Sequence, residues 1–514
     1  MLSFLKKTAA LIWAKNHVKK SASFKNNAVQ NQKDLLLALI KKAEKTLFGR
    51  THLFEEITSI KDFQNKVPVA DYEQLKPYIE KVKKGQRDIL WPETPAYFAK
   101  TSGTTSGSKY IPISKEGMEN QTSAAQSAIF HYIAQKNTAN FVNGKMIFLQ
   151  GSPELEEIYG IKTGRLSGIV AHHIPSYLQK NRLPSIETNL IEDWEQKVDA
   201  IVKETEKENM TLISGIPPWL IMYFEKLIES QQKKSLSLGE EFRERKIKTI
   251  FPNLQLIITG GVNYEPYREK MEELLGGKVD VIQTFPASEG FFAFQDNFEE
   301  DGLLLLTDHG IFYEFIPLEN YGKPDQNDHR LTLDQIELNK DYALILTTNS
   351  GLWAYSIGDV VRFINKKPYK ILVSGRTKHF TSAFGEHVIA FEVEEAMKAT
   401  VEKFPAQISE FHLAPQVNPN SGSPFHEWFI EFEKEPENFL EFQKYLDEEL
   451  RNRNSYYDDL IKGNVLKPLI ISKLQKDAFQ EYARSEGKLG GQNKTPRLAN
   501  DRKIADILEK FRLV

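Results

Sequence analysis

Residues 254–283 read LQLIITGGVNYEPYREKMEELLGGKVDVIQ, and this stretch decides the fold class. Leu254–Thr259 is a short apolar run, which predicts a buried strand that ends at a pair of glycines. Residues 266–275 predict a helix, and Val279–Gln283 predicts the next strand. A strand, a helix and a strand joined by short links indicate a parallel sheet in an α/β layer.

The pattern changes on both sides of this stretch. Upstream, Lys145–Leu149 predicts another buried strand, and residues 115–134, 194–203 and 219–228 predict helices. From about residue 302 apolar residues alternate with polar ones, which predicts an antiparallel, β-barrel-like part with strands at 303–307, 312–316, 342–348, 360–364 and 369–373.

A last segment mixes helices and strands in an α+β order. We therefore expect an α/β protein with two domains. The large N-terminal domain, residues 1–377, would hold mostly parallel sheets flanked by helices together with the barrel-like part. The small C-terminal α+β domain, residues 378–514, would be mobile.

Composition excludes several classes of function. The chain has 514 residues and a formal charge of −3, so no strong positive field predicts a nucleic-acid partner. It has no cysteine, which excludes disulfides and a thiol nucleophile. Its histidines form no HxH or HExxH pattern, so we expect no tightly bound transition metal.

The first twenty residues contain an apolar stretch, Thr8–Ala14, that three lysines follow closely. This stretch is too short for a membrane span, and it lacks the cleavage site of a signal peptide. We interpret it as part of an amphipathic first helix. The expectation is therefore a cytoplasmic monomer without a membrane partner.

The segment Thr101–Lys109 reads TSGTTSGSK and combines hydroxyls, glycines and a lysine. Glycines let the backbone approach a phosphate closely, hydroxyls donate to its oxygens, and a lysine supplies positive charge. No Gly-Lys-Ser/Thr sequence closes the segment, so it is not a Walker A loop. These residues alone leave two interpretations open, a phosphate-binding loop and a plain Ser/Gly loop.

Four further segments carry side chains suited to a nucleotide site. Glu289 follows a predicted strand and could hold Mg²⁺, although Ser288 could equally cap a helix. Asp359 follows a glycine and could accept hydrogen bonds from a ribose diol, although Gly-Asp is also common in turns. Residues 375–378 (GRTK) could be a basic loop between domains, and residues 490–497 (GGQNKTPR) a frayed tail.

The order of these segments, from about residue 95 onward, resembles the adenylate-forming (acyl-activating) superfamily. Within it the chain is most similar to the auxin-responsive acyl acid–amido synthetases. Ser102–Gly107 has one residue more before its second glycine than acyl-CoA ligases have. Ala287-Ser288-Glu289 resembles the family's A-S-S-E segment, and residues 493–497 (NKTPR) are similar to its N-x-Y-K-x-P-R segment.

The resemblance implies an ATP- and Mg²⁺-dependent ligase. It would adenylate a small carboxylic acid and pass the acyl group to an amine, an amino acid by resemblance. Glu289 would bind Mg²⁺, and Lys494 would neutralise charge between the carboxylate and the α-phosphate. Lys378 would form the hinge between the domains. The nucleotide would be held by Ser102, Gly103, Thr104, Thr105, Gly107, Lys109, Gly260, Gly261, Ser288, Asp359 and Arg376.

The acyl pocket is the least defined part of this expectation. We expect Ser123, Gln126, Phe130 and Trp219 to contribute to it, with plain core packing as the alternative for the aromatic residues. Two other functions stay open. One is an acyl-CoA ligase, which shares the adenylation step, and the other is a nucleotide-binding protein without catalysis.

The chain also departs from the family pattern at three places. Phe285 or Pro286 stands where family members have tyrosine. Ser356 replaces the arginine of a Y-R-x-G-D motif, and His387 aligns with a lysine of the plant members. These changes affect substrate geometry more than the class of reaction.

Overall fold

The computed structural model divides the chain into two compact units. The first contains residues 1–357 and 361–373, and the second contains residues 358–360 and 374–514. The description covers the chain apart from residues 1, 102–108, 151, 175–178, 192–193, 238–244, 262–263, 378–379, 382–387, 417–418, 420–422, 463–465, 487–494, 500 and 514, and apart from some side chains inside elements.

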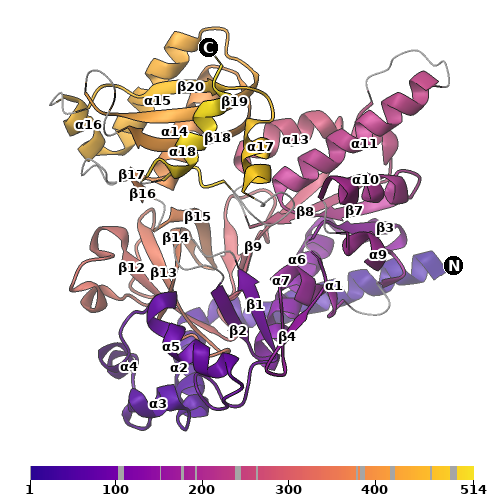
Figure 1. The fold of residues 1–514 in the computed structure, drawn as a ribbon. Helices are drawn as coiled ribbons and strands as arrows, with labels where there is room; N and C mark the ends of the chain where they lie inside the picture. The colour runs from indigo at the N-terminus through magenta and orange to yellow at the C-terminus, as the bar shows by residue number, and fades with distance from the viewer. Residues whose placement is uncertain are drawn as a thin grey trace. The chain divides into compact units, whose positions relative to one another are not determined.

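One sheet of eleven strands runs through the first unit. Figure 1 labels several of these strands, from β3 near one end to β12 at the other. Its parallel half consists, in spatial order, of β6 (Arg182–Leu183), β3 (Lys145–Phe148), β7 (Met210–Ser214), β8 (Leu256–Gly260) and β9 (Asp280–Ala287). The helix α13 (Arg268–Leu275) connects β8 to β9, so the predicted strand–helix–strand order of residues 254–283 is confirmed.

The other half of the sheet is the predicted barrel-like part. It continues from β9 through β10 (Gly290–Phe294), β11 (Leu303–Leu305), β15 (Tyr369–Arg376), β14 (Tyr355–Lys366), β13 (Asp341–Thr348) and β12 (Ile311–Pro317). The alternating residues from 302 onward do form strands, and these strands hydrogen-bond into the same sheet as the parallel half. The buried faces carry a large aromatic core around Trp353 and Phe363.

A second, smaller sheet holds the strands on either side of the Thr101–Lys109 segment. Its order is β2 (Lys109–Ile113), β1 (Tyr97–Thr101), β5 (Ile161–Gly164) and β4 (Glu156–Ile158). After β2 the helix α6 (Lys115–Lys136) begins, where the hydroxyl of its N-cap Ser114 accepts a hydrogen bond from the amide of Gly117 at 2.9 Å. The helix α6 packs against β10 and β9.

Helices cover the sheets of the first unit. The long N-terminal helix α1 (Leu2–Asn26) packs on α6, and α2 (Ala28–Ala43) packs on β12. Among the described residues, the unit's further α-helices apart from α6 and α13 are α3 (Leu47–Thr51), α4 (Ile60–Lys66), α5 (Tyr72–Lys83), α7 (Leu166–Ala171), α9 (Ile186–Asn189), α10 (Trp194–Thr205), α11 (Pro217–Ser237) and α12 (Ile247–Ile250). Among the described residues, none of the helices has the length and apolar character that crossing a membrane requires.

The second unit has the predicted α+β composition. Its three-stranded sheet consists of β18 (Gln407–Gln416), β19 (Phe425–Lys434) and β20 (Ile470–Leu474), and a short ladder pairs β16 (Phe380–Thr381) with β17 (Val388–Ile389). Its helices are α14 (Ala390–Lys403), α15 (Phe439–Arg453), α16 (Ser455–Lys462), α17 (Ala478–Ser485) and α18 (Lys503–Leu508). The fold is therefore a mixed α/β protein with a C-terminal α+β unit.

Candidate active site

The predicted glycine pair lies at the carboxyl end of β8. Gly260 pairs with Thr284 of β9, and a Cβ atom at Gly260 would come within 2.4 Å of the Thr284 hydroxyl oxygen. No larger residue fits there without moving β9. Gly261 follows with a φ of +77°, a left-handed conformation that favours glycine. Ligands of open α/β sheets bind at this edge of the sheet, and the two glycines keep it clear of side chains.

Ser288 and Glu289 form the two-residue turn between β9 and β10. Ala287 pairs directly with Gly290, so the chain makes a tight hairpin here, and the alternative of a helix capped by Ser288 is wrong. A Cβ atom at Gly290 would lie 2.4 Å from Ile311 Cδ1, so the Ile311 side chain packs closely against the glycine behind the turn. Both turn residues are half-buried.

A small pocket surrounds this turn. Its polar residues come from the turn itself, from α6, from the loop before β12 and from the loop after β13. They are Ser288, Glu289, Asn120, Gln121, His309, Asn349 and Ser350. The Gln121 side-chain amide reaches the Ser288 carbonyl oxygen at 3.5 Å, and Ser350 Oγ accepts a hydrogen bond from the Ser114 amide at 3.0 Å. The pocket therefore offers one carboxylate and several amide oxygens and nitrogens.

The strands β1 and β2 hold the ends of the predicted phosphate loop. Thr101 pairs with Lys109, so the intervening residues close an antiparallel hairpin just before α6. Lys109 Nζ lies 5.6 Å from the centre of the Tyr72 ring. The Tyr72 hydroxyl accepts a hydrogen bond from the Tyr110 amide at 2.9 Å, and burial raises its pKa. The predicted residues Ser102, Gly103, Thr104, Thr105 and Gly107 lie outside the described residues.

The predicted ribose-binding residues belong to the second unit. Asp359 is only 8% exposed and follows Gly358, which has a φ of +88°. The Thr377 amide donates a hydrogen bond to the Gly358 carbonyl oxygen at 2.7 Å. Asp359 on β14 and Arg376 on β15 are the neighbours of these two residues, so they lie opposite each other on adjacent strands. The structure thus brings the backbones of these two residues together, although the Arg376 side chain is not among those described.

Lys378, His387 and Lys494 also lie outside the described residues. The chain is described again from Thr495, one residue after Lys494, and there it is attached to β18. The Leu413 amide donates to the Arg497 carbonyl oxygen at 2.9 Å, and Leu498 forms an isolated parallel bridge with Leu413. The residues that follow Lys494 are therefore held on the second unit's sheet.

The predicted acyl-pocket residues occupy different surroundings. Phe130 packs its ring 5.1 Å from the ring of His17 on α1, and Gln126 is exposed. Ser123 Oγ donates to the Asn120 carbonyl oxygen at 3.0 Å. Trp219 is 6% exposed and belongs to a hydrophobic core between α10, α11 and the parallel strands. The α6 residues that do line the pocket at Glu289 are Gly117, Asn120 and Gln121, one turn earlier on the helix.

The departures from the family pattern have local explanations. Phe285 is buried and packs edge-to-face on Phe292 with ring centres 4.9 Å apart. Ser356 is buried, and its hydroxyl lies 2.8 Å from the Tyr321 hydroxyl. The Tyr321 hydroxyl is therefore the hydrogen-bond partner of Ser356, which stands at the position where the resemblance leads us to expect arginine.

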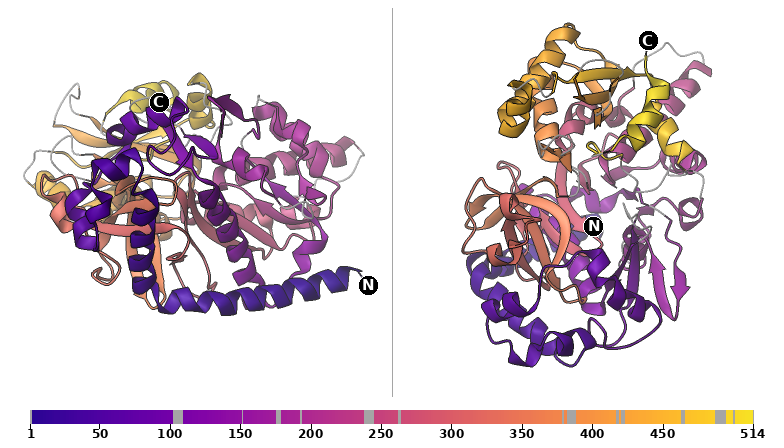
Figure 2. Two further views of the ribbon diagram at one scale, coloured as in Figure 1. Left: turned by 90° about the horizontal axis from the view of Figure 1, so that it is seen from below. Right: turned by 60° about the vertical axis from the view of Figure 1, so that its left-hand side comes forward.

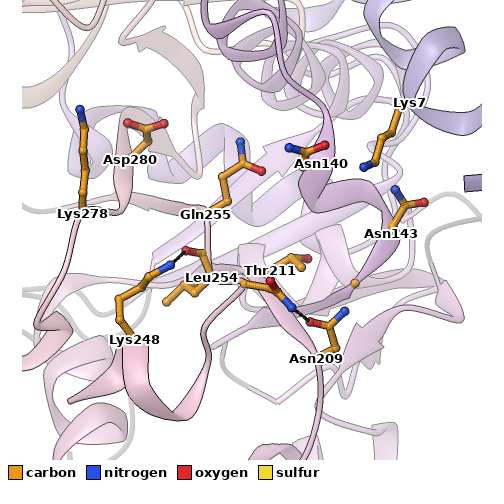
Figure 3. Close-up of a pocket in the computed structure, with 12 residues that line it drawn as sticks. Lys7, Asn140, Asn143, Asn209, Thr211, Lys248, Leu254, Gln255, Lys278 and Asp280 are labelled. Atoms are coloured by element: carbon orange, nitrogen blue, oxygen red, sulfur yellow. Dashed lines mark hydrogen bonds between the residues drawn. The ribbon is translucent and has the colours of Figure 1, made fainter. Parts of the chain in front are cut away.

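A larger pocket, of about 530 Å³, lies at the opposite edge of the same sheet (Figure 3). It is bordered by residues at the amino ends of the parallel strands, among them Asn143, Asn209, Gln255 and Asp280. Lys248 Nζ donates to the Leu254 carbonyl oxygen at 2.9 Å, and the Asn253 amide donates to Asn209 Oδ1 at 2.9 Å. None of the predicted site residues that the structure describes lines this pocket, so its size does not make it the candidate active site.

Comparison with known proteins finds one family along most of the chain. The N-terminal, central and C-terminal domains of the GH3 family match residues 17–182, 304–376 and 391–503, which together are well over half of the chain. A jasmonoyl–L-amino acid synthetase, GH3.5, of Oryza sativa subsp. japonica is 24% identical over 88% of this chain and 89% of its own length. An indole-3-acetic acid-amido synthetase, GH3.3, of Arabidopsis thaliana is 21% identical over 93% of this chain and 90% of its own length.

Solved structures show the same fold. The acyl acid amido synthetase AtGH3.15, in complex with 2,4-DB, superposes with a TM-score of 0.80 at 17% identity, over 98% of this chain and 96% of its own. A 2-hydroxyisobutyryl-CoA ligase in the postadenylation state superposes with a TM-score of 0.57 at 13% identity, over 95% of this chain and 92% of its own. The architecture is thus shared with amide-forming and thioester-forming relatives.

Proposed function

The chain belongs to the GH3 family, and from this premise we propose that it is an acyl acid–amido synthetase. It adenylates a carboxylic acid with ATP and then transfers the acyl group to an amine, for which an amino acid is the best candidate. Relatives that match most of this chain are named as a jasmonoyl–L-amino acid synthetase and an indole-3-acetic acid-amido synthetase. Neither acid is assigned to this chain.

The reaction has two halves. First, a carboxylate oxygen attacks the α-phosphorus of ATP, the bond to the bridging oxygen breaks, and pyrophosphate leaves. The amine nitrogen then attacks the acyl carbon, the carbon–oxygen bond to the phosphate breaks, AMP leaves, and the nitrogen loses a proton. The first step brings two anions together, so the chain must supply positive charge and hold the reactants in line.

The observation that carries this proposal is the half-buried turn carboxylate of Glu289 beside the start of α6. Mg²⁺ prefers oxygen ligands and is commonly held by one or two carboxylates together with substrate phosphates. Glu289 lines the pocket at the turn and can supply one such carboxylate ligand, with substrate phosphates supplying others. Among the described residues no group of three or more acidic or histidine side chains forms an all-protein metal cage. A bound Mg²⁺ would offset phosphate charge during adenylation.

The remaining roles follow from the resemblance. Residues 102–107 would hold the phosphates with their amides and hydroxyls, and Gly260 and Gly261 would line the adenine pocket. Asp359 would accept hydrogen bonds from the ribose, assisted by Arg376. Lys494 would reach the α-phosphate, and Lys378 would act as the hinge at a division between residues 377 and 378. We also propose a cytoplasmic location, in line with the absence of cysteine.

The experiment that tests the proposal is ATP–pyrophosphate exchange with Mg²⁺ across a panel of aliphatic and aromatic acids, without any acceptor. Exchange that depends on one acid supports adenylation and identifies the acyl substrate. No exchange with any acid, together with no ATP binding by calorimetry, contradicts the proposal.

A second assay separates the amide-forming function from an acyl-CoA ligase, which the resemblance to 2-hydroxyisobutyryl-CoA ligase keeps relevant. The pre-formed acyl-adenylate is offered an equimolar mixture of amino acids and coenzyme A, and the products are identified by mass spectrometry. We expect an amide. A thioester as the main product would assign the chain to the second class.

A further inference from the structure

The helix α1 has an unusual charge. Its sequence contains six lysines, Lys6, Lys7, Lys15, Lys19, Lys20 and Lys25, and no aspartate or glutamate, whereas the whole chain carries a formal charge of −3. The positive charge of this one element is therefore not a property of the protein's surface in general. A helix that is basic throughout suggests a negatively charged partner.

One face of α1 packs against the body of the first unit. Ala14 is fully buried, His17 Nε2 lies 2.8 Å from Ser127 Oγ on α6, and Lys25 forms an ion pair with Asp296 at 2.8 Å. Figure 2 shows α1 as a long helix at the edge of the unit, with its N-terminal end at the periphery. These contacts fix which side of the helix faces outward.

The outward face combines large apolar side chains with lysines. Successive residues of an α-helix are about 100° apart, so Ile12 points away from the buried Ala14. Ile12 is 53% exposed and Trp13 is 62% exposed. Lys6, Lys15, Lys19 and Lys20 are also exposed, and none of the four forms an ion pair with a residue that the structure describes. The face is therefore apolar in part and positive in the rest.

The charge of this face decides between partners. A second copy of α1 would bring two strongly positive helices together, so self-association through this face is opposed by repulsion. A nucleic acid would satisfy the lysines but would leave Ile12 without an apolar environment. An anionic bilayer satisfies both, because its headgroups attract lysines while tryptophan and aliphatic side chains enter the boundary between headgroups and acyl chains.

We propose that α1 binds the surface of a membrane that contains anionic lipids, lying in the plane of the bilayer with Ile12 and Trp13 inserted. The match to the family's N-terminal domain model begins at residue 17, after both of the side chains that we expect to insert. The expectation of no membrane partner rested on the absence of a spanning segment. Binding on the surface requires none.

The test is co-sedimentation with vesicles of phosphatidylcholine alone and of an equal mixture of phosphatidylcholine and phosphatidylglycerol. We expect binding to the mixture only, weakened by added salt. The variant I12A/W13A and the variant K15E/K19E/K20E should each weaken binding by about tenfold or more, because one removes the inserted groups and the other reverses the attraction. Thermal unfolding verifies that each variant is folded.

Matched controls make the test specific to α1. The variant K115E/K207E/K226E reverses three exposed lysines elsewhere on the same unit, and L440A removes a leucine that is 77% exposed. Both should bind vesicles as the unaltered chain does. Trp13 emission provides a second readout, because Trp91, Trp219, Trp353 and Trp428 are buried, so brominated lipid should quench the unaltered chain more than W13F.

Three outcomes overturn the proposal. One is equal loss of binding in K115E/K207E/K226E, which would indicate a diffuse charge effect. Another is full binding by I12A/W13A, which would exclude insertion. The third is binding to double-stranded DNA or RNA without binding to the anionic vesicles, which would assign the face to a nucleic acid.

Discussion

At the scale of the residue, the turn between β9 and β10 concentrates the chemistry that we assign to the first unit. Glu289 is one of the two residues in that turn, and it lines the pocket there. Replacing a glutamate with glutamine removes the negative charge that holds Mg²⁺ and hardly changes the size of the side chain. The exchange of Glu289 for glutamine is therefore a clean test of the assigned role.

We expect E289Q to lower the rate of ATP–pyrophosphate exchange by about 10²-fold or more and to raise the Mg²⁺ concentration needed for half-maximal exchange. The control is E119Q, which alters an exposed glutamate on α6. An unchanged Mg²⁺ requirement in E289Q would show that this carboxylate does not hold the ion.

Asp359 offers a second test at this scale, because a lost ribose contact can be mimicked on the nucleotide. We expect D359N to bind ATP about tenfold to a hundredfold more weakly by calorimetry, the usual loss for a hydrogen bond to a charged group. Replacing ATP with 2′-deoxy-ATP should weaken binding to the unaltered chain and change little in D359N. If the two changes weaken binding independently and additively, Asp359 does not contact that hydroxyl.

At the scale of the element, the contact between α1 and α6 contains a buried histidine. His131 is 3% exposed, its Nδ1 lies 2.9 Å from the Ser127 carbonyl oxygen, and its Nε2 lies 3.4 Å from Ser21 Oγ. Burial lowers the pKa of His131 to about 4, and Lys25 contributes to the same effect. The ring is therefore neutral in the folded protein at neutral pH.

This shift predicts how stability depends on pH. In the unfolded chain His131 has its ordinary pKa near 6.5, so between pH 6.5 and pH 4 the unfolded state binds more protons and is favoured as the pH falls. The free energy of unfolding is unaffected by this histidine above pH 6.5. It has fallen by about 3 kcal/mol once the pH reaches the pKa of His131 in the folded protein. In H131Q we expect the difference in Tm between pH 7 and pH 5 to shrink. Parallel curves for the two proteins would contradict this interpretation.

The elements also show what could be predicted from sequence. Long apolar runs and alternating runs predicted β8, β12, β13 and α6 close to their observed bounds. The strand β9 was predicted to end at Gln283 but continues to Ala287. The strands β4 and β5 were not predicted, because Glu156–Ile158 and Ile161–Gly164 are too short and too polar to show a period of two. The hairpin after β9 had a usable signal, since Gly290–Phe294 reads GFFAF and is buried throughout.

The residues of the candidate site also differ in whether the sequence could predict them. Glu289, Asp359 and the glycine pair stand in motifs, so the sequence could point to them. Asn120 and Asn349 are single amides more than two hundred residues apart that the fold brings to one pocket, and no local pattern marks either of them. A pocket built from loops after distant strands becomes visible only when the strand order is known.

At the scale of the whole molecule, the proposed function divides labour between the two units. Lys494 belongs to the second unit, in a segment whose following residues return to β18. If that lysine acts in adenylation, its removal should slow adenylation but leave the rate of acyl transfer from a pre-formed acyl-adenylate nearly unchanged. The two half-reactions can therefore be measured separately in one variant.

We expect K494A to slow pyrophosphate exchange by about 10²-fold or more, and to change the rate of amide formation from pre-formed acyl-adenylate by less than about threefold. The control K503A alters an exposed lysine that pairs only with Asp501 among the described residues. Equal losses in both half-reactions would indicate that Lys494 has a structural role.

The second unit is built from two separate segments of the chain, which limits where related sequences can be recombined. Residues 358–360, inside β14, group with residues 374–514, so the backbone passes between the units three times. A crossover in the gene near the end of β15 would combine residues 358–360 of one parent with the C-terminal residues of the other, although the Thr377 amide donates to the Gly358 carbonyl oxygen within one unit. Swaps between relatives at that point therefore mix two parents inside the second unit, whereas a chimaera that also exchanges β14 and β15 takes the whole unit from one parent.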